Sequence, residues 1–166
     1  MFELKDRPVR ASDKTALYAG LAEDLRALLH GERDVIANAA NMASLIYHTL
    51  PDVNWVGLYL LKDGELVLGP FHGRPACVRI ALGRGVCGTA AARRETILVP
   101  DVSAFPGHIA CDSASRAELV VPLIEQGRLL GVLDLDSPVP ARFDQTDREG
   151  CETLAAIYLD SLTAAA

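Results

Sequence analysis

The sequence predicts an α+β fold in which helices flank a central, mostly antiparallel sheet. Two helical patterns precede the first strand-like segment, two β-hairpins follow, and a further amphipathic helix closes the chain. Consecutive hairpins, as opposed to repeated strand–helix–strand units, are typical of α+β folds. We expect the N- and C-terminal helices to pack on the same face of the sheet.

Length and composition limit the classes of protein to consider. With 166 residues, half of them apolar, the chain fits a single domain over 1–166, with a helical arm at 1–50 and a sheet core with its final helix at 54–162. No apolar run approaches the ~20 residues that cross a bilayer, and the first residues lack an apolar signal core. The net charge of -6 argues against binding to nucleic acid. We therefore expect a cytoplasmic protein without membrane or nucleic-acid partners.

Two helices are predicted before the sheet. Ser12 and Asp13 are suitable N-cap residues for the first, and Gly31 ends its pattern. The second begins at about Asp34 and ends before Pro51. The apolar face of the first helix consists of leucines spaced by four and three residues: Leu17, Leu21, Leu25 and Leu28.

The strands are predicted from apolar runs interrupted by turn residues. The first hairpin joins 55–61 to 65–68, and the second joins 118–124 to 129–136. Pro122 weakens its strand or places it near an edge of the sheet, because proline has no backbone N–H to donate.

The segments between and after the hairpins are more varied. A strand is predicted at 76–81, a short helix at 89–93 and another strand at 97–99, followed by an irregular loop at 100–116. Such a long loop in a compact domain is usually functional. Asp144 or Thr146 caps the final helix. A glycine turn precedes the short helix and contains Gly83, Gly85 and Gly88.

The four cysteines lie in different surroundings. Cys111 lies in the long loop, Cys77 where a loop enters a strand, and Cys87 where the glycine turn opens a helix. A helix N-terminus stabilises a thiolate and would lower the Cys87 pKa, although Cys77 and Cys87, taken singly, are more often small core residues. Cys151 falls on the buried stripe of the final helix and is interpreted as a core residue. Three thiols at element boundaries suit a nucleophile with resolving partners.

Carboxylates and aromatic residues form a second candidate group. Asp134 and Asp136 point to one face of their strand, and Glu118 begins the partner strand. Like charges at this distance require a cation or a shared proton, unless they form a solvated strand end. Trp55 and Tyr59 also share a face, where they pack in the core or form an aromatic wall. Such a wall suits a small cation or a sulfoxide methyl group.

Two other chemistries are less well supported. The glycine turn matches neither common phosphate-binding pattern, so turn geometry explains it better. A zinc site has suitable residue types but no compact ligand spacing. Its candidate ligands are His72, Cys77, Cys87, His108 and Cys111.

Several segments together resemble the free methionine-R-sulfoxide reductases, which are built on a GAF domain. They are Asn54-Trp-Val-Gly-Leu-Tyr, Gly69-Pro-Phe-His-Gly-Arg-Pro-Ala-Cys, Gly83-Arg-Gly-Val-Cys-Gly-Thr, Gly107-His-Ile-Ala-Cys-Asp, Ser115-Arg-Ala-Glu-Leu-Val-Val-Pro-Leu and Gly131-Val-Leu-Asp-Leu-Asp-Ser. The second hairpin alone would indicate only a small-ligand domain. The joint presence of Cys77, Cys87 and Cys111 distinguishes the reductases from sensors.

The resemblance implies a thiol mechanism on free L-methionine-R-sulfoxide. Cys111 would attack the sulfoxide sulfur, release methionine and become a sulfenic acid. Cys77 is the favoured resolving thiol and Cys87 a second or relay thiol, with their order left open. Thioredoxin or a similar dithiol would reduce the resulting disulfide.

The same resemblance implies how the substrate is held. Glu118, Asp134 and Asp136 would surround its ammonium group and sulfoxide oxygen, and one of them would donate a proton. Trp55 and Tyr59 would hold the methyl end, with Tyr59 also able to donate a hydrogen bond. No cofactor or metal is expected, and a homodimer through the terminal helices is implied by the resemblance only. The alternative function is a non-enzymatic GAF sensor of a small ligand or of redox state.

Overall fold

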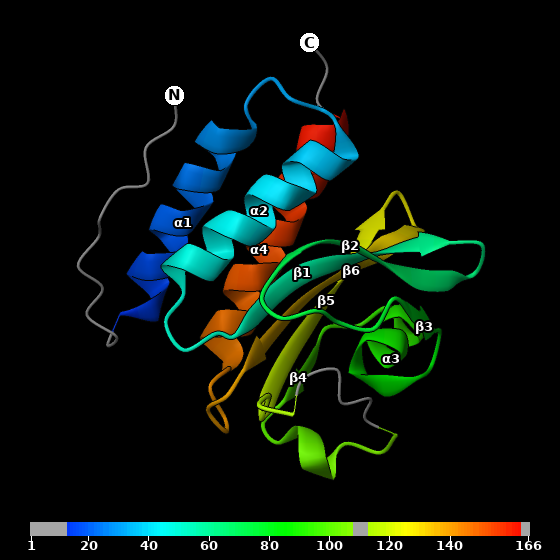
Figure 1. Ribbon diagram of the computed structural model, residues 1–166. Coiled ribbons are helices and arrows are strands. Elements are labelled where there is room, and N and C mark those ends of the chain that lie inside the picture. The colour runs from blue at the N-terminus through cyan, green and yellow to red at the C-terminus, as the bar shows by residue number, and fades with distance from the viewer. Residues whose placement is uncertain (1–12, 108–112, 164–166) are drawn as a thin grey trace.

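The computed structural model describes residues 13–107 and 113–163, and Figure 1 shows the arrangement of their helices and strands. Cys111 and His108 lie outside the described residues. In chain order the elements are α1 (Lys14–Leu29), α2 (Val35–Thr49), β1 (Trp55–Lys62), β2 (Glu65–His72), β3 (Arg79–Ala81), α3 (Gly85–Arg93), β4 (Ile97–Val99), the 3₁₀ helix η1 (Val102–Ala104), β5 (Ala117–Glu125), β6 (Arg128–Ser137) and α4 (Gln145–Thr163).

The six strands of the described chain form one sheet in the order β3-β2-β1-β6-β5-β4. Every neighbouring pair of strands in it is antiparallel. The two predicted hairpins are β1–β2 and β5–β6, and they meet where β1 pairs with β6. The predicted α+β architecture is confirmed.

One face of the sheet is covered by α1, α2 and α4 (Figure 1). Alternate apolar residues of the central strands are buried against these helices, among them Val56, Leu58, Leu119, Leu133 and Leu135. The terminal helices therefore share a face of the sheet, as predicted. No helix in the described ranges has both the length and the apolar character that a membrane span requires.

The opposite face is covered by the smaller helix α3 and its flanking loops (Figure 1). A second apolar cluster lies there and includes Trp55, Tyr59, Val132, Val86 and Ala90. Because α3 is short, it leaves part of this face open. That opening becomes the site described below.

Aspartate side chains begin three of the α-helices. Asp13 accepts a hydrogen bond from Ala16 N, and Asp34 accepts from Ile36 N and Ala37 N. At α4 the cap is Asp144, whose Oδ1 accepts from the backbone N–H of Thr146 and of the residue after it. These bonds satisfy amides that lack a partner within the helix. Of the two predicted caps for α4, the structure therefore selects Asp144.

Four predicted boundaries were wrong. The strand expected at 65–68 continues to His72 as the second half of β2. The strand expected at 76–81 contains only Arg79–Ala81, because it pairs only with the first residues of β2. Cys77 therefore lies in a loop before the strand. The helix expected at 89–93 begins at Gly85, which places Cys87 inside its first turn. The loop expected at 100–116 contains η1, whose N-cap Asp101 accepts a hydrogen bond from Ser103 N.

Gly88 allows α3 to start so close to β3. A Cβ atom at this position would lie 2.3 Å from the backbone oxygen of Ala81, a distance that no side chain tolerates. The absence of a side chain thus fixes how closely the helix and the strand approach.

Pro122 lies on an open part of an interior strand. β5 is flanked by β4 and β6, but β4 pairs only with residues 118–120 of β5. Pro122 therefore lies beyond the end of β4. The edge of β5 that faces β4 has no paired strand at this residue, so the missing N–H of proline breaks no hydrogen bond between strands there. The prediction that Pro122 lies near an edge of the sheet is correct for this part of β5, although β5 as a whole is an interior strand.

A buried ionic network connects α1 to α4. Asp147 is fully buried and accepts hydrogen bonds from the Tyr18 hydroxyl at 2.9 Å and from Arg142 Nη1 at 3.0 Å. Lys14 forms a further ion pair with it. Arg142 also donates to the Pro51 carbonyl, so the network reaches the segment that enters β1.

We predict that Asp147→Ala lowers the free energy of unfolding by about 3–5 kcal/mol, because it leaves the Arg142 charge buried without its partner. Urea denaturation measures this. Asp160→Ala, an exposed position on the same helix, is the control and should change stability by less than about 0.5 kcal/mol. Equal stabilities of the two variants would contradict the importance of the network.

Candidate functional site

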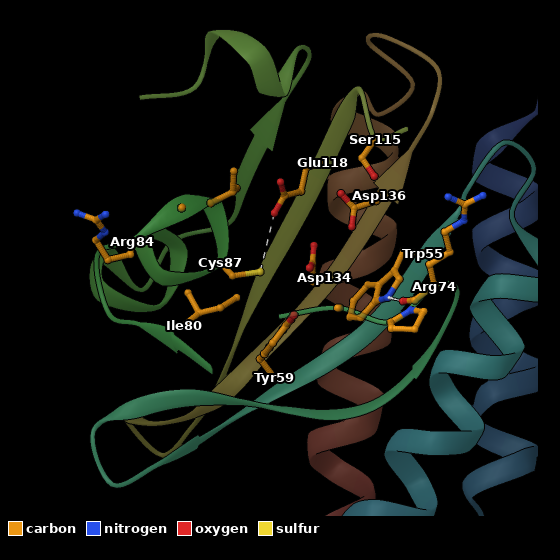
Figure 2. Close-up of a pocket in the computed structure, with 14 residues that line it drawn as sticks. Trp55, Tyr59, Arg74, Ile80, Arg84, Cys87, Ser115, Glu118, Asp134 and Asp136 are labelled. Carbon is orange, nitrogen blue, oxygen red and sulfur yellow. Dashed lines mark hydrogen bonds between the residues drawn. The ribbon is translucent and has the colours of Figure 1, made fainter. Parts of the chain in front are cut away.

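A pocket opens on the face of the sheet that carries α3 (Figure 2). Its walls come from β1, β5, β6, the first turn of α3, and β3 with the segments on either side of it. The lining residues are Trp55, Tyr59, Arg74, Pro75, Ala76, Ile80, Arg84, Gly85, Val86, Cys87, Ser115, Glu118, Asp134 and Asp136.

Strand register brings the predicted carboxylates and aromatic residues to one face. Asp136 pairs with Glu118 on one side and with Trp55 on the other. Asp134 lies two residues before Asp136 on β6, and Tyr59 lies four residues after Trp55 on β1. Both therefore point to the same face of the sheet. All five predicted binding residues therefore line a single pocket.

The aromatic wall is a stack of three rings. Trp55 stacks on Tyr59, with ring centroids 5.9 Å apart, and on Phe71 at 5.4 Å. Gly57 lies between Trp55 and Tyr59 on the strand, and a Cβ there would come within 2.5 Å of both Phe71 and Trp55. Because Gly57 has no side chain, the rings of Trp55 and Phe71 can stack next to it.

Both aromatic residues hold the segment that carries Cys77. Trp55 Nε1 donates to the Arg74 carbonyl at 3.0 Å, and the Tyr59 hydroxyl donates to the Cys77 carbonyl at 3.0 Å. The hydroxyl proton of Tyr59, expected to face the substrate, is therefore directed to the backbone. Burial, followed by the nearby carboxylates, raises the Tyr59 pKa, so the phenol stays protonated.

Two of the three carboxylates are buried. Glu118 and Asp134 are each 6% exposed, so they do not form a solvated strand end. Burial raises the Asp134 pKa well above its usual range, and the Glu118 charge raises it further. Asp136 is only partly buried at the mouth of the pocket. An acidic group that keeps its proton near neutral pH can act as a proton donor.

Cys87 lies against these carboxylates. Its Sγ is 3.9 Å from Glu118 Oε1, as the dashed line in Figure 2 shows. Burial and then the charges of Asp134 and Glu118 raise the Cys87 pKa well above that of an ordinary thiol. The expected lowering by the helix N-terminus was wrong, because desolvation and two acidic neighbours outweigh it.

The remaining cysteines differ from Cys87. Cys77 is disulfide-bonded, whereas Cys87 and Cys151 have free thiols. Cys151 is completely buried in α4, where burial raises its pKa to about 12, which confirms its interpretation as a core residue. Cys111, the predicted nucleophile, lies outside the described residues.

The predicted zinc ligands are not brought together in the described part of the chain. His72 packs against Tyr47 and His48 of α2, with ring centroids 5.6 and 5.5 Å away, and does not line the pocket. A different set is close: ligand atoms of Cys87, Glu118 and Asp134 lie within 4.8 Å of one another.

Several pocket residues were missed by the sequence-based prediction. Ser115 is buried beside the carboxylates and accepts a hydrogen bond from Asn54 Nδ2 at 3.3 Å. Ile80 and Val86 supply apolar lining, and Phe71 backs the aromatic wall. Apolar residues in short elements show no pattern that separates pocket lining from core. Ser115 belongs to a segment with reductase resemblance, so that segment was the available signal.

Comparison with known proteins assigns the chain to a family. The chain matches the GAF domain over residues 13–158. It is 51% identical over 144 residues to the free methionine-R-sulfoxide reductase of Escherichia coli, covering 87% of each chain. The chain belongs to the GAF-domain family of free methionine-R-sulfoxide reductases. The yeast reductase of this family, from Saccharomyces cerevisiae, is 43% identical over 148 residues, which cover 84% of this chain and 78% of the yeast protein.

A solved structure of the family extends the likeness to the fold. The free methionine-R-sulfoxide reductase of Neisseria meningitidis, crystallised with its substrate, superposes with a TM-score of 0.91 at 45% identity. The match covers 98% of this chain and 96% of the Neisseria chain. The family resemblance noted in the sequence is thereby confirmed.

We predict that Cys87 reacts slowly with iodoacetamide at pH 7 and accelerates only above the usual thiol range of about 8.5, because its raised pKa leaves little thiolate. Glu118→Gln removes a neighbouring negative charge, lowers the Cys87 pKa and should shift the alkylation profile to lower pH. Peptide mapping by mass spectrometry measures each thiol separately.

Free glutathione provides the reference profile in the same experiment. A wild-type Cys87 profile that coincides with that of glutathione, or an unchanged profile in Glu118→Gln, would contradict the assigned electrostatics.

Proposed function

We propose that this protein reduces free L-methionine-R-sulfoxide to methionine through a cysteine sulfenic acid and an intramolecular disulfide, with thioredoxin or a similar dithiol as reductant. The observation that carries the proposal is one pocket in which a stacked aromatic wall faces buried carboxylates beside the Cys77 segment. The names of its relatives and the substrate complex of the Neisseria enzyme support the same substrate.

The two walls of the pocket match the two ends of the amino acid. An aromatic face accommodates the S-methyl group, and carboxylates attract the ammonium group. Glu118 and Asp134 lose solvation on burial. A bound cation therefore stabilises negative charge on them more than it would in water. A substrate whose amino group is blocked lacks this attraction, so we expect a preference for the free amino acid over peptides.

Chemistry begins with Cys111 as nucleophile. Its thiolate attacks the sulfoxide sulfur, oxygen is transferred to the cysteine, and methionine leaves as the thioether, giving a sulfenic acid. The sulfoxide oxygen requires a proton during this step. Asp134 is the donor we favour, because its burial and its Glu118 neighbour keep it protonated.

The sulfenic acid is then resolved by a second thiol. The Cys77 thiol attacks it, a disulfide forms and water leaves. The disulfide-bonded state of Cys77, with Cys87 free, supports Cys77 as the resolving residue. Cys87 is a poorer candidate because its raised pKa disfavours the attacking thiolate. An external dithiol then exchanges with the disulfide and restores both thiols.

The decisive test is turnover of free methionine sulfoxide with thioredoxin, thioredoxin reductase and NADPH. We expect consumption of the R epimer but not the S epimer, and rates at the uncatalysed level for Cys111→Ser. Cys151→Ser, which alters a buried thiol outside the pocket, is the matched control and should retain activity.

Three results would contradict the proposal or a part of it. Absence of turnover by the wild-type protein with any dithiol would favour a non-enzymatic ligand sensor. Full activity in Cys111→Ser would exclude it as the nucleophile. Poor turnover of N-acetyl-methionine-R-sulfoxide is expected, and equal turnover would contradict the role of the carboxylates.

We further predict that Tyr59→Phe slows disulfide formation by about 2- to 10-fold, since it removes a hydrogen bond worth roughly 0.5–1.5 kcal/mol that positions Cys77. Trapping the sulfenic acid with dimedone during a single turnover measures its lifetime. Tyr47→Phe, outside the pocket, is the control. An unchanged sulfenic acid lifetime in Tyr59→Phe would show that this bond does not position the resolving thiol.

A further inference from the structure

We propose that the pocket also binds a thiophilic divalent cation, zinc or cadmium, through Cys87 Sγ and the carboxylates of Glu118 and Asp134. The ion would occupy the place of the substrate's ammonium group and inhibit the enzyme. The competition with substrate rests on the proposed function, whereas binding of the ion does not.

The geometry of these three side chains suits one ion. Their ligand atoms lie within 4.8 Å of one another, and Cys87 Sγ is 3.9 Å from Glu118 Oε1. Zinc binds sulfur at ~2.3 Å and carboxylate oxygen at ~2.0–2.2 Å, which places tetrahedral ligands roughly 3.5 Å apart. Small side-chain rotations would therefore complete the site. Three protein ligands leave a fourth position for water.

An unpartnered oxygen independently points to a ligand at this place. Asp134 Oδ1 is buried and has no hydrogen-bond partner among the described residues. Figure 2 shows the Asp134 side chain in the space between Cys87 and Trp55, inside the pocket. A buried polar atom without a partner is costly, and a metal ion or a substrate ammonium group would remove that cost.

Charge and ligand type favour a thiophilic cation. Figure 2 shows the exposed side chains of Arg74 and Arg84, the arginines that line the pocket, directed away from the carboxylates. A divalent ion neutralises carboxylate charge directly, and coordination displaces the protons of the Cys87 thiol and the Asp134 carboxyl group, which leave to solvent. A thiolate ligand favours zinc and cadmium over magnesium and calcium.

Cadmium is the probe of choice, because its thiolate bond absorbs in the ultraviolet. The protein is the full chain carrying Cys77→Ser and Cys111→Ser, which leaves only the thiols of Cys87 and Cys151. It is reduced with a phosphine, which is then removed. We expect one cadmium ion per chain by calorimetry, together with cadmium–thiolate absorption that zinc abolishes by displacement.

Further substitutions in this background identify the ligands. Cys87→Ser should abolish the absorption. Asp134→Asn and Glu118→Gln should each weaken binding by at least about tenfold, since even outer-sphere partners of metal sites are worth roughly 10- to 100-fold. Cys151→Ser is the matched control, because it removes the other buried free thiol, and should change nothing.

The outcomes separate this inference from the reductase proposal, because binding is measured without turnover. Absence of cadmium–thiolate absorption, its persistence in Cys87→Ser, or unchanged affinity in both carboxylate variants would overturn the site. Free methionine-R-sulfoxide should displace the ion. Retention of cadmium at saturating sulfoxide would overturn the competition but leave the metal site in place.

Discussion

Side chains on a β-strand alternate between the two faces of the sheet, and the three central strands of this protein use that alternation to separate two environments. Val56 and Leu58 of β1 face the three large helices, while Trp55, Gly57 and Tyr59 face the pocket. The same alternation runs through β5 and β6. A register shift of one residue would bury the pocket carboxylates against the helices, so core packing fixes the position of the site.

The pocket itself depends on two opposing requirements. Its buried carboxylates are unfavourable without a cation or a proton, whereas its aromatic wall is stabilised by stacking and burial. Hydrogen bonds from Trp55 and Tyr59 connect that wall to the backbone at Arg74 and Cys77. The residues that contact the substrate in the proposed function therefore also hold the segment of Cys77, the proposed resolving residue. The burial of Glu118 and Asp134 favours a cation or a retained proton beside them.

Much of the fold and of the pocket was predictable from local patterns. Helix caps, hairpin turns and period-two alternation act over a few residues. The caps Asp34 and Asp144 and the common face of Asp134 and Asp136 could therefore be predicted from the sequence. The start of α3 was not predictable in the same way. It depends on the close contact between Gly88 and Ala81, which are seven residues apart. Patterns that depend on packing between elements leave no local signal.

The sequence by itself determined the α+β class, the sharing of one face by the terminal helices, and the residue types available for thiol chemistry. Only the tertiary structure decided what those residues experience. Cys87 has the helix position that favours a thiolate, yet its burial against Glu118 and Asp134 keeps it protonated. The physical reason is that pKa values depend on solvation and on charges within a few ångströms, and those neighbours come from strands about 30 to 50 residues away in the chain.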